Sequence, residues 1–256
     1  MTTHHENTSV LKRLVGKSKA IKEVKKFINL AARYDYPVII SGETGVGKTL
    51  VAQMIHMVSK RKGKPFLLQS CSNISEELCE SELFGHEKGA FTGAIVRKKG
   101  KIEIADGGTF FLDEIADLSL QTQAKILLFI DRGKFFRVGG TEEIEVDVRI
   151  IAASNRDLKK EIRTGRFRED LYFRLNTINI YIPPLRDRRE DIPFLVEEIL
   201  RRENERNKMN KNISSEAINK LLNYDFPGNV RELENIIKRA FILSQENEIK
   251  ENDVFF

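Results

Sequence analysis

The chain has 256 residues, of which 41% are hydrophobic and 32% charged, and its formal net charge at pH 7 is +5. This length fits one large domain, or a large domain with a small one, and the composition is typical of a soluble globular protein. The sequence has no apolar run long enough to span a membrane, which excludes a transmembrane protein. Cys71 and Cys79 form no C-x-x-C pair, so they predict a reducing cytoplasm and exclude a disulfide framework or zinc site.

A strand, a glycine-rich turn and a helix are predicted in succession after a polar tail (1–13) and a first helix (19–34). The strand covers 37–41, and apolar residues recur at helical spacing from residue 50. Between them lies the pattern G-x-x-x-x-G-K-[ST], whose backbone N–H groups curl around phosphates. Lys48 would reach the β- and γ-phosphates of ATP, and the Thr49 hydroxyl would hold Mg²⁺. The full motif reads Gly42, Glu43, Thr44, Gly45, Val46, Gly47, Lys48, Thr49.

Residues 65–69 predict a second strand, and Asn73 with Glu76 is a capping pair for a helix ending near residue 84. Glycines then recur through residues 84–100 and disfavour a buried regular element. Phe91 lies at the centre of this stretch. Two interpretations stay open from local pattern: Phe91 folds back on the core, or it is an exposed aromatic that contacts a partner.

A third strand at 109–112 ends in two carboxylates, Asp113 and Glu114. Downstream of a phosphate loop, on a strand long enough to lie beside the first, this pair is typical of an ATPase. Asp113 would lie beside Mg²⁺, and Glu114 would orient water against the γ-phosphate. A helix is predicted over 119–132, with Leu120, Ala124, Leu127 and Leu128 on its inward face.

A fourth strand at 148–153 is followed by Asn155, which either faces the same crevice as Lys48 or caps the next helix. Arg168 and Arg174 lie on a short helix within 167–175. They are either ordinary surface charges or fingers that stabilise γ-phosphate charge in a neighbouring subunit. A fifth strand covers 177–182, and two prolines then end the α/β region.

Everything from about residue 191 is predicted to be helical. Asn229 with Glu232 should cap the last helix, which carries Arg231 in its first turn. The expected fold is therefore α/β, with a five-stranded parallel sheet flanked by helices over 14–184. A small all-helical lid follows over 185–256.

Taken together, these motifs resemble the central AAA+ domain of bacterial enhancer-binding proteins, the ATPases that activate sigma-54 RNA polymerase. The resemblance runs from about residue 14 to residue 248. Its most specific element is the G-A-F-T-G-A signature. In that family the loop grips the sigma factor in an ATP-dependent way, so the resemblance implies an exposed Phe91. The signature residues are Gly89, Ala90, Phe91, Thr92, Gly93 and Ala94.

The resemblance also implies a role for each remaining motif. Val15 and Gly16 would line the adenine pocket, Asn155 would sense the γ-phosphate, and Arg231 would be the sensor of the lid. Arg168 and Arg174 would act across the interface of a ring-shaped homo-oligomer, usually a hexamer. Residues 137–140 would form a second pore-side loop. ATP and Mg²⁺ would be the substrate and cofactor.

The chain departs from the family at Ser70, where members usually carry an asparagine that restrains the catalytic glutamate. A serine is shorter but still donates and accepts hydrogen bonds, so looser ATPase coupling is a hypothesis. Neither a regulatory domain nor a helix-turn-helix is recognisable, and DNA binding by this chain is not expected. The alternatives are an AAA+ ATPase with another protein client, a small-molecule kinase and a nucleotide-binding scaffold without turnover. The kinase and the scaffold fit the motifs poorly.

Overall fold

The computed structural model describes residues 10–11, 13–72 and 75–256. Its contacts divide the chain into two compact units. The first unit contains residues 27–41 and 48–181, and the second contains residues 11–26, 42–47 and 182–256. The predicted boundary at residue 184 stays a prediction. Among the described residues, no helix is both long and apolar enough to cross a membrane.

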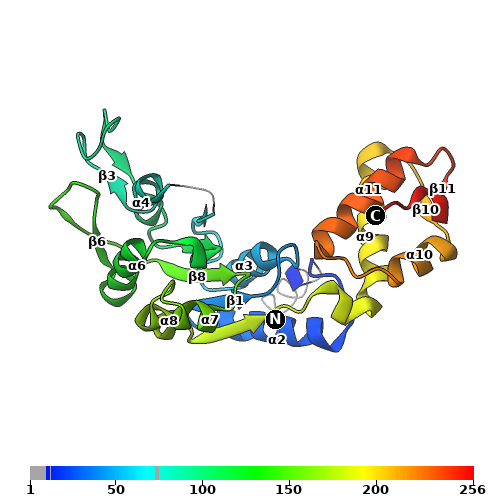
Figure 1. Ribbon diagram of the computed structural model, residues 1–256, viewed down its shortest axis with the longest axis horizontal. Coiled ribbons are helices and arrows are strands. Elements are labelled where there is room, and N and C mark those ends of the chain that lie inside the picture. The colour runs from blue at the N-terminus through cyan, green and yellow to red at the C-terminus, as the bar shows by residue number, and fades with distance from the viewer. Residues whose placement is uncertain (1–9, 12, 73–74) are drawn as a thin grey trace. The chain divides into compact units, whose positions relative to one another are not determined.

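A five-stranded parallel sheet forms the centre of the first unit (Figure 1). The order is β2-β5-β8-β1-β9, so the predicted α/β class and five parallel strands are confirmed. The prediction that the strand ending in Asp113 lies beside the first strand was wrong. That strand, β5, pairs with β8, and β8 pairs with β1. A strand's own residues do not encode its neighbours. The strands are β1 (Val38–Ser41), β2 (Phe66–Ser70), β5 (Thr109–Asp113), β8 (Arg149–Ser154) and β9 (Ile178–Tyr181).

Parallel register brings the carboxyl ends of these strands to one edge of the sheet. Ser41 is paired with Ser154 and with Tyr181, and Ser70 is paired with Asp113. Segments that follow different strands therefore begin at the same edge, where α/β sheets bind ligands.

Both faces of the sheet are covered, as the long apolar runs of the strands require. Phe110 and Leu112 of β5 lie in a core cluster with residues of α4, α6 and α8. Phe111 points to the opposite face, because side chains alternate along a strand, and α3 contacts β1, β5 and β8. The helices are α2 (Lys19–Arg33), α3 (Lys48–Met57), α4 (Glu76–Phe84), α5 (Lys101–Ile104), α6 (Leu120–Arg132), α7 (Leu158–Arg163) and α8 (Glu169–Leu175), with the 3₁₀ turn η1 (Ile115–Asp117).

Two short antiparallel pairs accompany the sheet. They are β3 (Gly85–His86) with β4 (Lys98–Lys99), and β6 (Lys134–Phe136) with β7 (Glu143–Glu145).

The predictions for two helices of the first unit were wrong in detail. The N-cap of α4 is Ser75, and the predicted cap Asn73 lies outside the described residues. Leu120 and Leu128 of α6 are exposed, because the helix buries a row led by Thr122, Ile126 and Phe129 instead.

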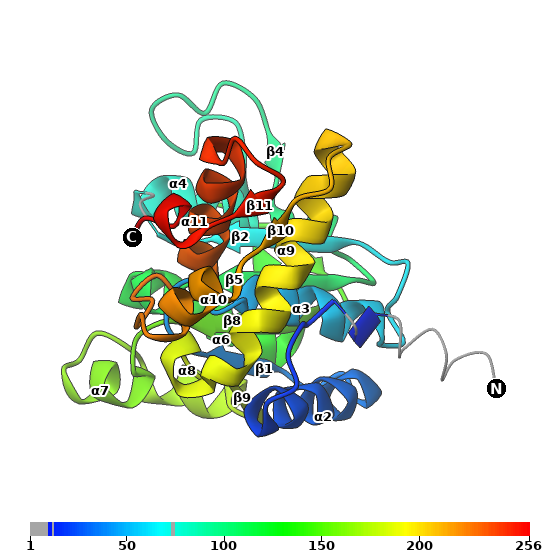
Figure 2. The same ribbon diagram turned by 90° about the vertical axis from the view of Figure 1, so that its right-hand side faces the viewer.

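The second unit is mostly helical (Figures 1 and 2). Many of its buried side chains form an apolar cluster drawn from α9, α10, α11 and the segments that join them. The all-helical prediction was wrong in one respect: β10 (Asn212–Ile213) pairs in parallel with β11 (Glu248–Ile249). Strands of two residues are too short to produce an alternating pattern. The other elements are η2 (Leu185–Asp191), α9 (Ile192–Asn207), α10 (Ser215–Leu222), α11 (Asn229–Leu243) and η3 (Glu251–Asp253).

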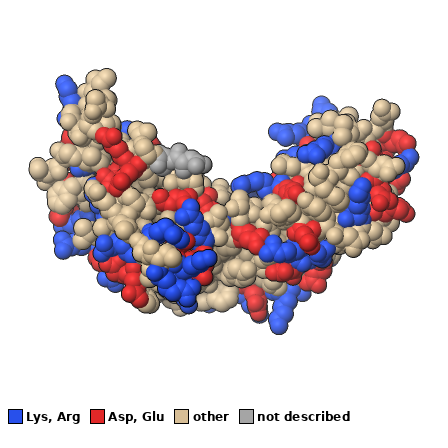
Figure 3. Space-filling model, in the orientation of Figure 1, with Lys and Arg blue, Asp and Glu red and all other residues tan. Residues whose placement is uncertain are grey.

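Charges of both signs are interspersed on the face shown in Figure 3. The basic run at 97–99 illustrates the pattern, because its three side chains form ion pairs with Glu87, Glu82 and Glu103. The positive charge of this run is therefore balanced by neighbouring carboxylates.

Candidate functional site

The phosphate loop, residues 42–49, leads from β1 into the first residues of α3. Gly42 and Gly45 have φ of +155° and +81°, a backbone conformation that L side chains rarely adopt. A Cβ atom would come within 2.6 Å of the Ile182 carbonyl oxygen at Gly42, and within 2.2 Å of the Gly228 carbonyl oxygen at Gly45. These glycines therefore permit close backbone contacts. The N–H groups at the start of α3 suit an anion.

Lys48 and Glu114 form an ion pair in the first unit. The Lys48 Nζ lies 3.0 Å from Glu114 Oε1, and the side chains are only 7% and 16% exposed. Glu114 follows β5 in the left-handed conformation, with φ of 55° and ψ of 53°. Such strain in a residue other than glycine is typical of functional sites. The lysine predicted to bind phosphate and the glutamate predicted to orient water are thus together at the carboxyl edge of the sheet.

Asn155 completes the contacts around Glu114. Its backbone N–H donates to Glu114 Oε2 over 2.8 Å. The alternative that Asn155 caps α7 is wrong, because the N-cap is Asp157, whose carboxylate accepts from the N–H groups of Lys159 and Lys160. Asn155 therefore helps to fix the orientation of the Glu114 carboxylate.

Asp113 and Thr49 supply the oxygen ligands expected for Mg²⁺. Asp113 is the last residue of β5, and Thr49 is the second residue of α3, which packs against β5. Carboxylate and hydroxyl oxygens are the hard donors that Mg²⁺ takes in proteins, so this pair fits the ion. Ser70 is paired in register with Asp113. The Glu114 contacts described above come from Lys48 and Asn155, not from Ser70.

Asn229 holds the phosphate loop within the second unit. Its Nδ2 donates to the Thr44 carbonyl over 3.0 Å and to Glu43 Oε2 over 3.1 Å, while its Oδ1 accepts from the Leu185 N–H over 2.7 Å. The side chain is fully buried, and φ is +56°. The predicted capping role was wrong, because Gly228 is the N-cap of α11 and Glu232 accepts its N–H.

Hydrogen bonds from Arg186, and then from Asn229, lower the pKa of Glu43 to about 2. Glu43 is therefore ionised at neutral pH.

Arg231 and Arg188 also contact the phosphate loop. Arg231 lies in α11, where its N–H donates to the Gly45 carbonyl over 3.3 Å and its side chain is exposed. Val46 is buried, and its carbonyl accepts from Arg188 over 3.4 Å.

Asp191 organises the predicted adenine segment. This buried carboxylate accepts hydrogen bonds from the Lys17 N–H, the Ser18 N–H and the Ser18 hydroxyl, over 2.6, 2.8 and 2.6 Å. Gly16 lies so close that a Cβ would come within 2.8 Å of the Asp191 carboxyl carbon. Val15 packs against the core of the second unit.

The sequence analysis did not single out Asp191 or the role of Asn229. Lys17 is 174 positions from Asp191, and Thr44 is 185 positions from Asn229. The only local signal was Pro-Gly-Asn before a helix, since asparagine is enriched at positive φ.

Arg168 and Arg174 lie at opposite ends of α8, on the surface of the first unit. Arg168 is the N-cap residue and pairs with Asp170 over 2.7 Å, and Arg174 pairs with Asp131. Their side chains are 40% and 57% exposed. Both side chains are therefore accessible at the surface, as either interpretation of these arginines requires.

The signature loop, residues 89–94, is carried by the β3–β4 pair, which we call the stalk (Figure 1). Gly89 N–H donates to the Ala94 carbonyl over 2.8 Å, and Ala94 N–H donates to the Phe91 carbonyl over 3.0 Å. Phe91 is half-buried, whereas Thr92 and Gly93 are exposed. Phe91 neither joins the apolar core cluster of the first unit nor stands clear of the protein, because its ring contacts His86.

The second loop, residues 137–140, is attached to the stalk. Val138 N–H donates to the Gly85 carbonyl over 3.0 Å, and Glu87 N–H donates to the Val138 carbonyl over 3.1 Å. Arg137 is buried and forms ion pairs with Glu87 and Glu103 over 3.0 and 2.8 Å. The two predicted loops are therefore one connected structure.

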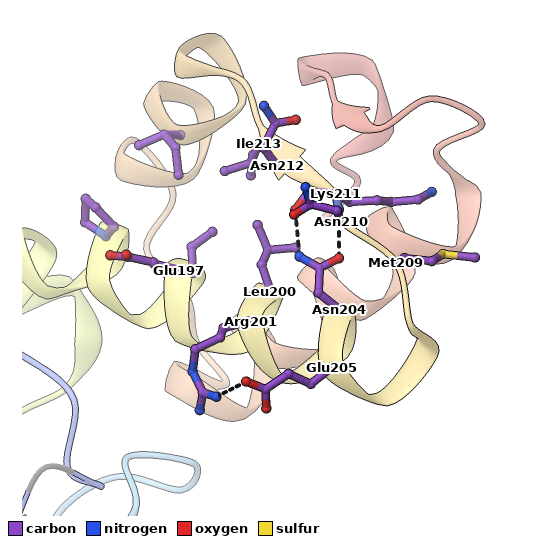
Figure 4. Close-up of a pocket in the computed structure, with 13 residues that line it drawn as sticks. Glu197, Leu200, Arg201, Asn204, Glu205, Met209, Asn210, Lys211, Asn212 and Ile213 are labelled. Atoms are coloured by element: carbon purple, nitrogen blue, oxygen red, sulfur yellow. Dashed lines mark hydrogen bonds and ion pairs between the residues drawn. The ribbon is translucent and has the colours of Figure 1, made fainter.

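The second unit contains a separate pocket of about 520 Å³ beside α9 and β10 (Figure 4). Asn204 closes one end, with hydrogen bonds of 2.8 and 2.7 Å to the backbone carbonyl and N–H of Lys211. Arg201 and Glu205 pair at the rim over 2.5 Å. None of the predicted site residues lines this pocket, and we assign it no function.

Comparison with known families gives two matches. The Sigma-54 interaction domain matches residues 14–181, and the AAA+ ATPase lid domain matches residues 186–255.

Curated relatives cover nearly the whole chain. It is 47% identical over 246 residues to the Nif-specific regulatory protein of Klebsiella pneumoniae, covering 96% of this chain and 47% of that protein. It is 48% identical over 250 residues to the response regulator protein PilR of Pseudomonas aeruginosa, with coverages of 97% and 56%. For the transcriptional regulatory protein ZraR of Escherichia coli the identity is 49% over 242 residues, with coverages of 94% and 55%. The chain thus spans about half the length of the curated relatives it matches.

Solved structures give the same picture. NtrX from Brucella abortus in complex with ATP has a TM-score of 0.86 and 37% identity, covering 94% of this chain and 56% of that chain. The complex of NtrX with ADP has a TM-score of 0.87 at the same identity.

Proposed function

The chain belongs to the Sigma-54 interaction domain family, and from that membership we propose that it hydrolyses ATP to remodel the closed complex of sigma-54 RNA polymerase. Promoter opening would follow. The signature loop carries this proposal, because residues 89–94 lie on a stalk in the same unit as Lys48 and Glu114. A cytoplasmic location and a homo-oligomeric ring, with six subunits as the expected number, belong to the same proposal.

The phosphate loop would bind the triphosphate. Backbone N–H groups of residues 42–47 and the Lys48 ammonium would contact its oxygens, and Val15 with Gly16 would contact the base. Thr49 and Asp113 would hold Mg²⁺, which when bound neutralises charge on the phosphates. Arg231 would sense the nucleotide from α11. The solved complexes of NtrX with ATP and ADP support a nucleotide as the ligand.

Glu114 would orient the attacking water and accept its proton. One of its carboxylate oxygens is held by Lys48 and the other by the Asn155 N–H. Because a triphosphate carries more negative charge than one carboxylate, it competes for Lys48 and releases that oxygen for water. Asn155 then keeps the carboxylate oriented. Hydrolysis would thereby depend on a bound triphosphate.

Arg168 and Arg174 would complete the site of a neighbouring subunit. An arginine supplied in trans stabilises transition-state charge on the phosphoryl group and accelerates hydrolysis by roughly 10³–10⁵. Their exposure on α8 agrees with a role outside their own subunit.

Two measurements test the proposal. Glu114→Gln should lower ATP hydrolysis by roughly 10²–10⁴ while nucleotide still binds, because only the general base is lost. The unmodified chain with ADP–aluminium fluoride should bind purified sigma-54, and Phe91→Ala should abolish this binding. Ile242→Ala removes an equally apolar, exposed side chain outside the first unit and is the matched control.

A chain that hydrolyses ATP but does not bind sigma-54 would favour the alternative, an AAA+ ATPase with another protein client. Ser70, at the position where the family usually has asparagine, would then be the first residue to exchange. Binding that is independent of Phe91 would contradict the role assigned to the loop.

A further inference from the structure

His86 lies where the stalk, helix α4 and the second loop meet. Its backbone pairs with Lys98 across the stalk and forms a parallel bridge with Val138. Its side chain is buried, and both ring nitrogens have partners: Nδ1 lies 2.7 Å from Ser81 Oγ, and Nε2 lies 3.0 Å from the Val96 carbonyl oxygen. The ring is therefore attached to both arms of the signature loop and to α4.

The hydrogen-bond partners define the form of the ring. A backbone carbonyl can only accept, so Nε2 must carry the proton donated to Val96. In the neutral ring Nδ1 is then an acceptor, and the Ser81 hydroxyl donates to it. Each partner is satisfied by one tautomer, and the ring cannot rotate about its χ2 bond without breaking both bonds.

The fixed ring contacts the aromatic residue of the signature. The centroids of His86 and Phe91 are 5.0 Å apart, and the ring planes meet at 70°, an edge-to-face arrangement. Such pairs add attraction beyond simple burial. Phe91 is only half-buried and lies outside the apolar core cluster of the first unit, so the contact with His86 holds its ring against the stalk.

We propose that His86 is a positioning residue that sets the orientation of Phe91 for its contact with a protein partner. Hydrogen bonds to Ser81 and Val96 fix the imidazole, and the imidazole holds the phenyl ring against the stalk. This assignment rests on the proposed function for the identity of the partner. The orientation of the loop itself can be measured without that partner.

The chain contains no tryptophan, so Phe91→Trp introduces a single tryptophan at the tip of the loop, whose fluorescence can be excited without exciting the tyrosines. Acrylamide quenching then reports how well the introduced ring is protected. Adding His86→Gln keeps an N–H donor near Val96 but removes the aromatic edge. We expect the population of the released loop to rise about two- to tenfold, since an aromatic contact of this kind is lost.

Two further variants make the test specific. Ser81→Ala leaves the imidazole in place and removes only the Nδ1 partner, so it should shift quenching in the same direction by a smaller amount. It also serves if His86→Gln does not fold, as circular dichroism would show. His56→Gln is the matched control, because His56 is another buried histidine of the first unit, hydrogen-bonded to Thr109 over 3.0 Å.

The outcomes separate this assignment from the proposed function. Unchanged quenching in His86→Gln, or an equal change in His56→Gln, overturns the positioning role whatever the partner is. A quenching change, together with weaker sigma-54 binding by a His86→Gln chain that keeps Phe91, supports both. A quenching change in a chain that never binds sigma-54 supports the positioning role of His86 and contradicts the identity of the partner alone.

Discussion

Asn229 shows how one side chain can determine the position of the phosphate loop. It has three hydrogen bonds, no exposure to solvent and a positive φ, which asparagine tolerates better than most residues. The same amide serves as acceptor for one segment and as donor to another. Leu185 would lose its acceptor, and the Thr44 carbonyl would lose its donor, if the amide were removed. Loop geometry therefore depends on a residue far from the motif in sequence.

Asn229→Ala should lower the free energy of unfolding by about 2–5 kcal/mol, from an unsatisfied buried N–H and a strained backbone. Nucleotide affinity should fall with it. Asn229→Gly relieves the strain but not the lost hydrogen bonds, so it should recover only part of the stability. Urea denaturation and nucleotide titration check both expectations.

Asn223→Ala is the control, because the side-chain amide of this exposed asparagine donates to the Asn219 carbonyl over 3.0 Å. It should change stability by no more than about 0.5 kcal/mol. Equal losses in Asn223→Ala and Asn229→Ala would mean that the buried amide does not hold the phosphate loop.

At the scale of elements, long apolar runs made the five strands predictable, and helical spacing made most helices so. The alternation at β10 and β11 could not be seen, because each strand has two residues. The order of the strands could not be predicted from the sequence either, as the position of β8 between β5 and β1 shows. The same limit applies to the candidate site. Lys48 and Glu114 were found from motifs, whereas Asn229 and His86 act through contacts that only the folded chain creates.

Gly139 is the point at which the second loop contacts the signature loop. Its φ is +73°, and a Cβ there would lie 2.8 Å from Ala90 Cβ and 3.0 Å from Ala90 Cα. Gly139→Ala should therefore strain the backbone and also displace the signature loop. The displacement should raise acrylamide quenching of a tryptophan introduced by Phe91→Trp, and it should weaken partner binding.

Gly165→Ala separates these two effects. Gly165 has φ of +70°, but a Cβ there would contact nothing within 4 Å, so the variant carries only the backbone strain of about 1 kcal/mol. The Gly139 variant should lose about 1–3 kcal/mol more, from overpacking. If both variants left quenching at the tip unchanged, the two loops would be structurally independent.

At the scale of the whole molecule, the proposed site is divided between subunits. Glu114 is held inside the first unit by Lys48 and Asn155. Arg174 instead lies on the surface of α8, where its side chain pairs with Asp131 and is still 57% exposed. On the proposed function, Arg174 would stabilise the transition state at the nucleotide of another copy of the chain. Arg174→Ala alone should therefore lower ATP hydrolysis by roughly 10³–10⁵.

Mixing two inactive variants distinguishes action in trans from action in cis. A site in an Arg174→Ala subunit still has Glu114, and a Glu114→Gln neighbour still supplies Arg174, so equal mixing should restore hydrolysis at about a quarter of all sites. Phosphate release measured across mixing ratios should rise to a maximum near equality. No recovery at any ratio, with mixed oligomers demonstrated by differently tagged subunits, would place the arginine in its own subunit's site. The exposed ion pair between Arg174 and Asp131 would then be an ordinary surface interaction of α8. In that case ATP hydrolysis would not require a ring, and only the contact of Phe91 with its partner could require one.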